Sequence, residues 1–155
     1  LQICGNEAGV AAVMGHEIAH AIARHGAQRM TQQMLITGAL SVASLNYSNS
    51  QYKPLILGAL GVGATYGLKL PFSRANESEA DEIGIVYMAR AGYDPNEAVN
   101  FWTRFQNAKG DQPPEFMSTH PSDETRIERL SKLLPNALKK YGAAPVQHGI
   151  GEKVS

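Results

Sequence analysis

Apolar residues recur at close to every 3.6 positions in the first part of the chain. After a cap-like Asn6, valine, methionine, isoleucine and alanine repeat at this spacing, which predicts a helix over residues 7–31. His16, Glu17 and His20 interrupt the apolar run. Burying two imidazoles and a carboxylate is costly unless each has a partner, so these three residues call for a common explanation.

Residues 34–70 are apolar and rich in small side chains, and Lys53 and Lys69 are their only charges. The polar segment NYSNSQ separates two apolar stretches at 34–45 and 54–68. Each stretch is shorter than the ~20 residues that a membrane-spanning helix needs. We therefore expect a hairpin of two small-residue helices packed on the core, with peripheral membrane contact as a further option.

Helical patterns return in the second half of the chain. One covers residues 74–91 and ends at a glycine, and the next runs from an Asp94 cap to about residue 107. After a proline-containing loop, the amphipathic segment DETRIERLSKLL predicts a helix over 123–134. Pro135 should end it, and a short helix is predicted at 136–141.

Strand signals are scarce. LQIC at residues 1–4 and KLPFS at residues 69–73 are the only short candidates. The chain is therefore expected to be mainly α with little strand. Its length fits a single domain over residues 1–142, followed by a tail at residues 143–155.

Composition narrows the class of protein. An apolar share of 43% with 18% charged residues is typical of a globular protein. The formal net charge is +0 and no basic stripe is present, so a nucleic acid is not an expected partner. Cys4 is the single cysteine, which excludes an internal disulfide framework and a multi-cysteine zinc site.

The spacing of His16 and His20 points to a metal. Residues four apart project from one face of a helix, and two imidazoles placed in this way can bind one Zn²⁺. Glu17 lies about 100° around the helix from His16, where it can act as a general base on water held by the metal. The alternative is a pair of buried histidines bonded to backbone or carboxylate groups. His25 should face the opposite side as a solvated residue.

A catalytic zinc ion usually takes three protein ligands. The third histidine of a metzincin would fall on Gly26, so that class is excluded. The segment NESEADEIG offers Glu77 and Asp81, four apart on the next strong helix. Glu77 can ligate zinc while Asp81 accepts the second N–H of a ligand histidine. Glu79 and Glu82 belong to other faces and are expected to be solvated.

Three blocks occur in one order along the chain: HEIAH at 16–20, SRANESEAD at 73–81 and STHPSDETRI at 118–127. Together they resemble the M48 metallopeptidases, which include CAAX-processing proteases (Ste24 relatives), HtpX-type heat-shock proteases, Oma1-type proteases and soluble periplasmic relatives. The resemblance spans most of the chain and implies a zincin fold of the gluzincin type. It assigns Glu77 as the third zinc ligand and supports Asp81 beside the ligands.

The resemblance also implies roles for two later residues. His120 would either donate to the oxyanion of the tetrahedral intermediate or occupy the open zinc position and hold the enzyme idle. Arg126 would anchor the loop that carries His120 or bind an oxygen of the substrate or intermediate. Without the resemblance, a surface histidine and a solvated arginine would be the simpler interpretation.

The function implied is that of a zinc-dependent endopeptidase with one Zn²⁺ per chain, acting on polypeptides in quality control of the bacterial envelope. Membrane-bound members place transmembrane helices between the first two blocks, so the short stretches here favour the soluble, periplasmic or Oma1-like branch. An N-terminal anchor and a substrate-binding strand are expected upstream of Leu1. The oligomeric state stays open.

Two other functions are compatible with the sequence. One is a latent peptidase fold that serves as a chaperone or scaffold for envelope proteins. The other is a membrane-embedded processing enzyme for lipidated peptides, which the short apolar stretches disfavour.

Overall fold

The computed structural model describes residues 2–107 and 125–148 of the chain. Two compact units are present: the site unit, Leu1–His20 with Glu77–Ser155, and the hairpin, Ala21–Asn76. The described residues are almost entirely helical and contain no β-strand, which confirms the mainly α fold. LQIC and KLPFS are therefore wrong as strand candidates: the first forms a 3-10 helix, η1 (Gln2–Cys4), and the second lies in helix.

Helix α1 carries the block HEIAH and helix α4 carries the block SRANESEAD. The helices that contribute to the site unit are α1 (Glu7–Ile22), the second part of α4 (Leu70–Arg90), α5 (Asn96–Asn107) and α7 (Arg126–Gly142). After α7 the chain returns to the end of α4, where the backbone N–H of His148 donates to the carbonyl of Gly92 at 2.8 Å.

The core of the site unit is aromatic at its centre. Phe101, Trp102 and Phe105 on α5 are buried, and their ring centroids lie 5.1 to 5.7 Å apart. Leu130 and Ala137 of α7 are buried in the same unit. These amphipathic helices form because each buries one apolar stripe, and the stripe stabilises them beyond intrinsic propensity.

Packing of the α7 stripe explains one wrong prediction. Pro135 was expected to end the helix, but α7 runs through it without interruption from Arg126 to Gly142. Leu130 and Ala137 lie on either side of the proline and are both 1% exposed. A break at Pro135 would separate them, so burial outweighs the hydrogen bond that the proline removes.

The first helix ends earlier than expected. Instead of one helix over 7–31, α1 ends at Ile22 and α2 (His25–Asn46) begins after Arg24, whose φ of 57° is left-handed. Because the helix is broken at Arg24, the angle of a later residue around the axis can no longer be calculated from the position of His16. His25 is consequently buried, at 1% exposed, and its predicted solvated position was wrong.

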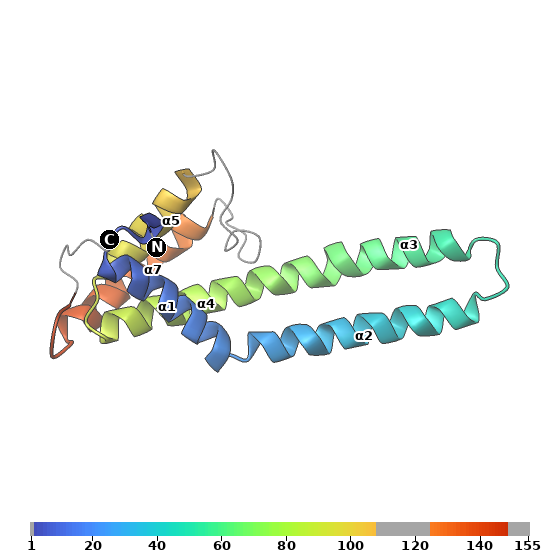
Figure 1. Ribbon diagram of the computed structural model, residues 1–155, viewed down its shortest axis with the longest axis horizontal. Coiled ribbons are helices and arrows are strands. Elements are labelled where there is room, and N and C mark those ends of the chain that lie inside the picture. Colours follow the sequence, from blue (N-terminus) through green and yellow to red (C-terminus); the bar gives the residue numbers. More distant parts are fainter. Residues whose placement is uncertain (1, 108–124, 149–155) are drawn as a thin grey trace. The chain divides into compact units, whose positions relative to one another are not determined.

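Within the hairpin, α2 runs alongside α3 (Lys53–Ala64) in the opposite direction, and a loop joins them (Figure 1). The predicted two-helix arrangement is therefore confirmed. The expected packing on the core is not: α3 has no buried residue, and α2 buries only His25.

The second arm of the hairpin is also longer than the sequence pattern indicated. The segment η2 (Thr65–Lys69), a π-helical turn, joins α3 directly to α4. One helix therefore extends over Lys53–Arg90, and part of it is apolar and long enough to cross a membrane. The prediction of separate helices at 54–68 and 74–91, with KLPFS between them as a strand candidate, is therefore wrong: all of these residues lie in one continuous helix.

Two glycines let α1 and α4 approach within backbone contact in the site unit. A Cβ on Gly84 would lie 2.8 Å from the backbone nitrogen of His16, and one on Gly15 would lie 2.8 Å from the carbonyl oxygen of Gly84. Any side chain at these positions would push the helices apart. The contact fixes the height of His16 above α4.

Replacing Gly84 with alanine should therefore destabilise the protein. We expect Gly84→Ala to lower the free energy of unfolding by about 1–3 kcal/mol, because the added methyl group meets backbone atoms that cannot move independently. The matched control is Gly58→Ala in α3, where a Cβ meets nothing within 4 Å. There, alanine should be neutral or stabilising by up to about 1 kcal/mol. Urea unfolding measures both, and equal effects would contradict the close contact.

Candidate metal centre

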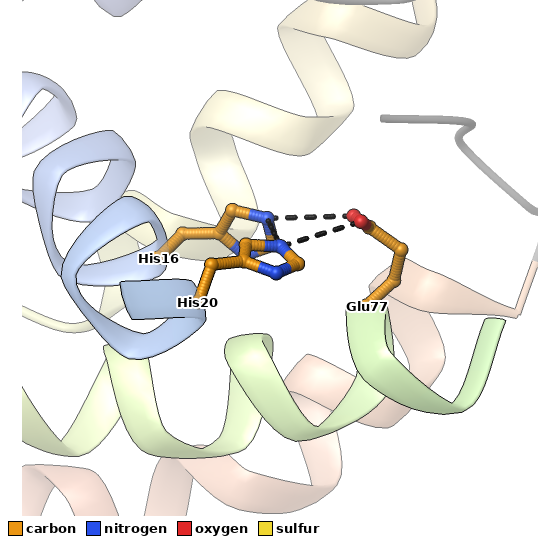
Figure 2. A group of neighbouring side chains, drawn as sticks. All are labelled: His16, His20 and Glu77. Atoms are coloured by element: carbon orange, nitrogen blue, oxygen red, sulfur yellow. Dashed lines mark hydrogen bonds and ion pairs between the residues drawn. The ribbon is translucent and has the colours of Figure 1, made fainter. Parts of the chain in front are cut away.

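His16 and His20 project from the same face of α1, and Glu77 of α4 points toward them (Figure 2). His16 and Glu77 are buried, and His20 is mostly buried. These three residues form a group whose donor atoms all lie within 4.8 Å of one another. The structure thus brings together the three residues that the sequence selected from two distant blocks.

The distances between the donor atoms fit a zinc ion. Nε2 of His16 lies 3.0 Å from Nε2 of His20, and the carboxylate of Glu77 lies 3.4 Å and 3.3 Å from these two nitrogens. In a tetrahedral site with Zn–N and Zn–O bonds of about 2.0–2.1 Å, neighbouring ligand atoms are about 3.3 Å apart. Oε2 of Glu77 is the oxygen near His16 and Oε1 is the oxygen near His20, so the two nitrogens and the carboxylate are spaced as ligands of one metal ion would be.

Asp81 and Arg126 surround the ring of His16. The Nδ1–H of His16 donates a hydrogen bond to Oδ1 of Asp81 at 2.9 Å, which leaves Nε2 directed at His20 and Glu77. Nη2 of Arg126 donates to the same Asp81 oxygen at 2.5 Å. Asp81 thus lies where the sequence placed it, beside the histidine and one turn from Glu77.

The guanidinium of Arg126 is enclosed on several sides. Its Nη1 donates to Oε2 of Glu77 at 3.3 Å, and its carbon lies 3.3 Å from the centroid of the Trp102 ring. The side chain of Arg126 is 2% exposed. It therefore acts on Glu77 and Asp81, holding both carboxylates in place, rather than facing solvent.

Charge in this cluster favours a cation. Two buried carboxylates face one buried guanidinium, so the group carries an excess negative charge when the histidines are neutral. Oε1 of Glu77 is buried, and its partner is Nε2 of His20 at 3.3 Å, an ion-pair contact rather than a hydrogen bond of good geometry. A buried carboxylate oxygen without a well-formed hydrogen bond is costly, and a metal ion would satisfy it.

The pKa values of His16 and Glu77 shift in opposite directions. Burial lowers the pKa of His16, but the hydrogen bonds to Asp81 and Glu77 outweigh it, so the net pKa is raised above 6.5. Burial raises the pKa of Glu77, but hydrogen bonds from His16 and His20 outweigh it and hold the pKa well below its usual range. Glu77 is thus an anion and is ready to bind a cation.

Of the two further predicted residues, Glu17 and His120, the structure describes Glu17. Glu17 lies on the same helix as the two histidines and is exposed, so its carboxylate is open to solvent and substrate. His120 lies outside the described residues. The residue that sequence analysis missed is Trp102, the single tryptophan of the chain; its contact with Arg126 joins α5 to α7 and has no local sequence signal.

Two histidines four apart on one helix, a carboxylate from a second helix and an adjacent glutamate are the arrangement of a metal-dependent peptidase. Comparison with known proteins gives the same class. Residues 1–134 match the family described as "Peptidase family M48", and the chain belongs to this family. It therefore carries the zincin-like domain of the M48 metallopeptidases, as the three sequence blocks indicated.

Known relatives come from mitochondria and bacteria. The chain is 39% identical to "Mitochondrial metalloendopeptidase OMA1" of Schizosaccharomyces pombe, over 96% of this chain and 43% of that protein. It is 34% identical to "Beta-barrel assembly-enhancing protease" of Yersinia pestis, over 92% of this chain and 30% of that protein. The chain thus spans less than half the length of these relatives. No solved structure matches it significantly.

Removing the guanidinium of Arg126 should leave the buried carboxylates of Glu77 and Asp81 without their positively charged partner. We expect Arg126→Met to lower the free energy of unfolding of the metal-free protein by about 3 kcal/mol or more, because breaking a buried ion pair strands its partners. Arg90→Met, at an exposed position in α4, is the control and should change stability by less than about 0.5 kcal/mol. Urea unfolding distinguishes the two, and equal losses would argue against the buried cluster.

Proposed function

We propose that this chain is the catalytic domain of a zinc-dependent endopeptidase. His16, His20 and Glu77 bind one Zn²⁺ per chain, and residues 1–142 form the peptidase domain. The spacing of the donor groups carries this proposal: the two histidine nitrogens lie 3.0 Å apart, and each lies 3.3 to 3.4 Å from one oxygen of the Glu77 carboxylate, close to the distances between ligand atoms around a zinc ion. Asp81 contacts the ligand His16 and Arg126 contacts the ligand Glu77, on atoms other than those that face His20.

The proposed reaction is hydrolysis of peptide bonds. When bound, zinc supplies Lewis-acid chemistry that polarises the scissile carbonyl and makes water a nucleophile at neutral pH. Glu17 accepts the proton of the attacking water and then delivers it to the leaving amine. His120 is proposed to donate to the developing oxyanion; its other proposed role is to block the open zinc position.

Arg126 is proposed as a positioning residue of this reaction. Its guanidinium contacts Glu77, Asp81 and the Trp102 ring, so it fixes the orientation of one ligand and of the carboxylate that holds another. This favours an indirect role over binding of a substrate oxygen. The general base and the ligands are thereby kept on a rigid support, which efficient catalysis requires.

The biological setting is proposed from the relatives. A "Beta-barrel assembly-enhancing protease" of a bacterium among them supports a role in quality control of polypeptides, and the location we propose is the bacterial periplasm, with membrane attachment of the protein. The higher identity to a mitochondrial relative favours a mitochondrial location as the second candidate. A peptidase fold that serves as a chaperone or scaffold is the alternative function.

Substitution of the general base separates catalysis from metal binding. We expect Glu17→Gln to lower kcat on an unfolded protein substrate by about 100-fold or more, with zinc content unchanged. Glu82→Gln, an exposed position on α4, is the matched control and should keep full activity. Retained activity in Glu17→Gln would contradict the proposed mechanism, and retained biological function without turnover would favour the chaperone.

Metal affinity should depend on pH through His16. Because zinc displaces the proton from Nε2, affinity should fall as the pH falls through the pKa of His16, which lies above 6.5 in the metal-free protein. Asp81→Asn keeps an oxygen that can accept the hydrogen bond but removes the negative charge that stabilises the protonated imidazole, so the midpoint should move to lower pH. Zinc titration across pH measures both variants, and a midpoint that stays in place would contradict the role given to Asp81.

A further inference from the structure

The indole ring of Trp102 covers one face of the Arg126 guanidinium. Both residues are buried, with Trp102 5% and Arg126 1% exposed, and both belong to the site unit. The central carbon of the guanidinium lies 3.3 Å from the centroid of the ring. A cation is attracted to an aromatic face within about 6 Å, and the attraction is stronger when the pair is desolvated, as it is here.

This contact restricts the plane of the guanidinium. A guanidinium is flat and carries its N–H donors in a rigid fork, so fixing its plane also fixes the directions of its hydrogen bonds. Nη1 donates to Oε2 of Glu77 at 3.3 Å, and Nη2 donates to Oδ1 of Asp81 at 2.5 Å. A tilt of the guanidinium on the indole would therefore disturb a candidate zinc ligand and the carboxylate that binds His16.

The indole also lies beside His16 itself. The two ring centroids are 6.1 Å apart, and the rings meet edge to face at an interplanar angle of 67°. A cavity lined by His16, Asp81 and Trp102, among others, has a volume of about 10 Å³, no more than one water molecule needs. A smaller side chain at position 102 would admit water to the ion pair and weaken its attraction.

Trp102 is held in turn by the aromatic core of the site unit. The ring centroids of Phe101 and Phe105 lie 5.2 Å and 5.1 Å from that of Trp102, and both rings meet it edge to face at 79°. Residues that support a functional site need rotamers locked by packing, and these contacts supply that packing. Helix α5, which carries no candidate ligand, thus contacts the site through Trp102.

We propose that Trp102 is a positioning residue of the metal centre. Its ring holds the Arg126 guanidinium in the plane from which both carboxylates are reached, and it thereby orients the ligands Glu77 and His16. Trp102 itself binds neither the metal nor the substrate. This inference rests on the proposed function, because it gives Trp102 an effect on zinc binding that a residue of the core alone does not have.

The zinc affinity of the full chain, measured by competition with a chelator at one fixed pH, tests the proposal. We expect Trp102→Leu to weaken zinc binding about tenfold, the lower end of the loss that follows when a partner of a metal ligand is removed. Trp102→Phe keeps an aromatic face that attracts a cation less strongly, and it should weaken binding about threefold. Phenylalanine should thus restore much of what leucine loses.

The matched control is Phe105→Leu. Phe105 is a buried aromatic residue of the same helix, 1% exposed, and its ring packs on Trp102. We expect Phe105→Leu to lower the urea midpoint of the metal-free protein, as Trp102→Leu does, while zinc affinity stays unchanged. An equal loss of zinc affinity in the two leucine variants would mean that only core packing matters, and it would overturn the proposal.

A double-mutant cycle with Arg126 tests whether Trp102 acts through the guanidinium. Arg126→Lys keeps the positive charge but removes the flat fork that stacks on the ring. In the Arg126→Lys protein, Trp102→Leu should weaken zinc binding by less than about twofold, because the contact is already lost. A full further loss of about tenfold would show that the two residues act independently, and it would overturn the indirect role.

The cycle does not depend on the leucine variant. If circular dichroism shows that Trp102→Leu does not fold, Trp102→Phe takes its place. The expected result is then a loss of about threefold with Arg126 present and no loss with Arg126→Lys. Equal losses in the two proteins would contradict the proposal.

The unsubstituted chain separates this proposal from the proposed function. If it binds no zinc, the proposed function fails and the role of Trp102 fails with it. If it binds zinc and a folded Trp102→Leu variant binds zinc equally tightly, only the role of Trp102 is overturned, and the assignment of the ligands stands.

Discussion

The ion pair between Arg126 and the two carboxylates of α4 is the interaction on which the site depends. It joins the last helix of the site unit to Glu77 and Asp81, and through Asp81 it reaches His16 on the first helix. Trp102 closes the remaining side of the guanidinium. Buried charges of this kind are costly one by one, so they are stable only together.

This mutual dependence joins the three helices that surround the candidate metal centre, α1, α4 and α7. Gly15 and Gly84 bring α1 and α4 into backbone contact, and that contact sets the distance between the histidines and Glu77. The excess negative charge that remains after Arg126 is paired creates a place for one cation. Glu17, the proposed general base, directly follows His16 in the sequence and is exposed.

Residue spacing was sufficient to select residues that the structure groups together, and helical periodicity was sufficient to predict most helices. His16, His20, Glu77 and Asp81 could be selected because positions four apart share a face, and the structure brings them together. The break at Arg24 and the continuous helix through Lys69 could not be predicted, since both depend on tertiary contacts or exposure. The stacking of Arg126 on Trp102 likewise joins residues from different helices, which no local pattern records.

X-ray absorption at the zinc edge tests the central claim most directly. For the full chain loaded with one equivalent of zinc, the account predicts a first shell of two imidazole nitrogens and carboxylate or water oxygens at about 2.0–2.2 Å. Glu77→Ala should lose the protein oxygen and bind zinc more weakly. A sulfur neighbour at about 2.3 Å, or a spectrum unchanged by Glu77→Ala, would contradict the proposed centre.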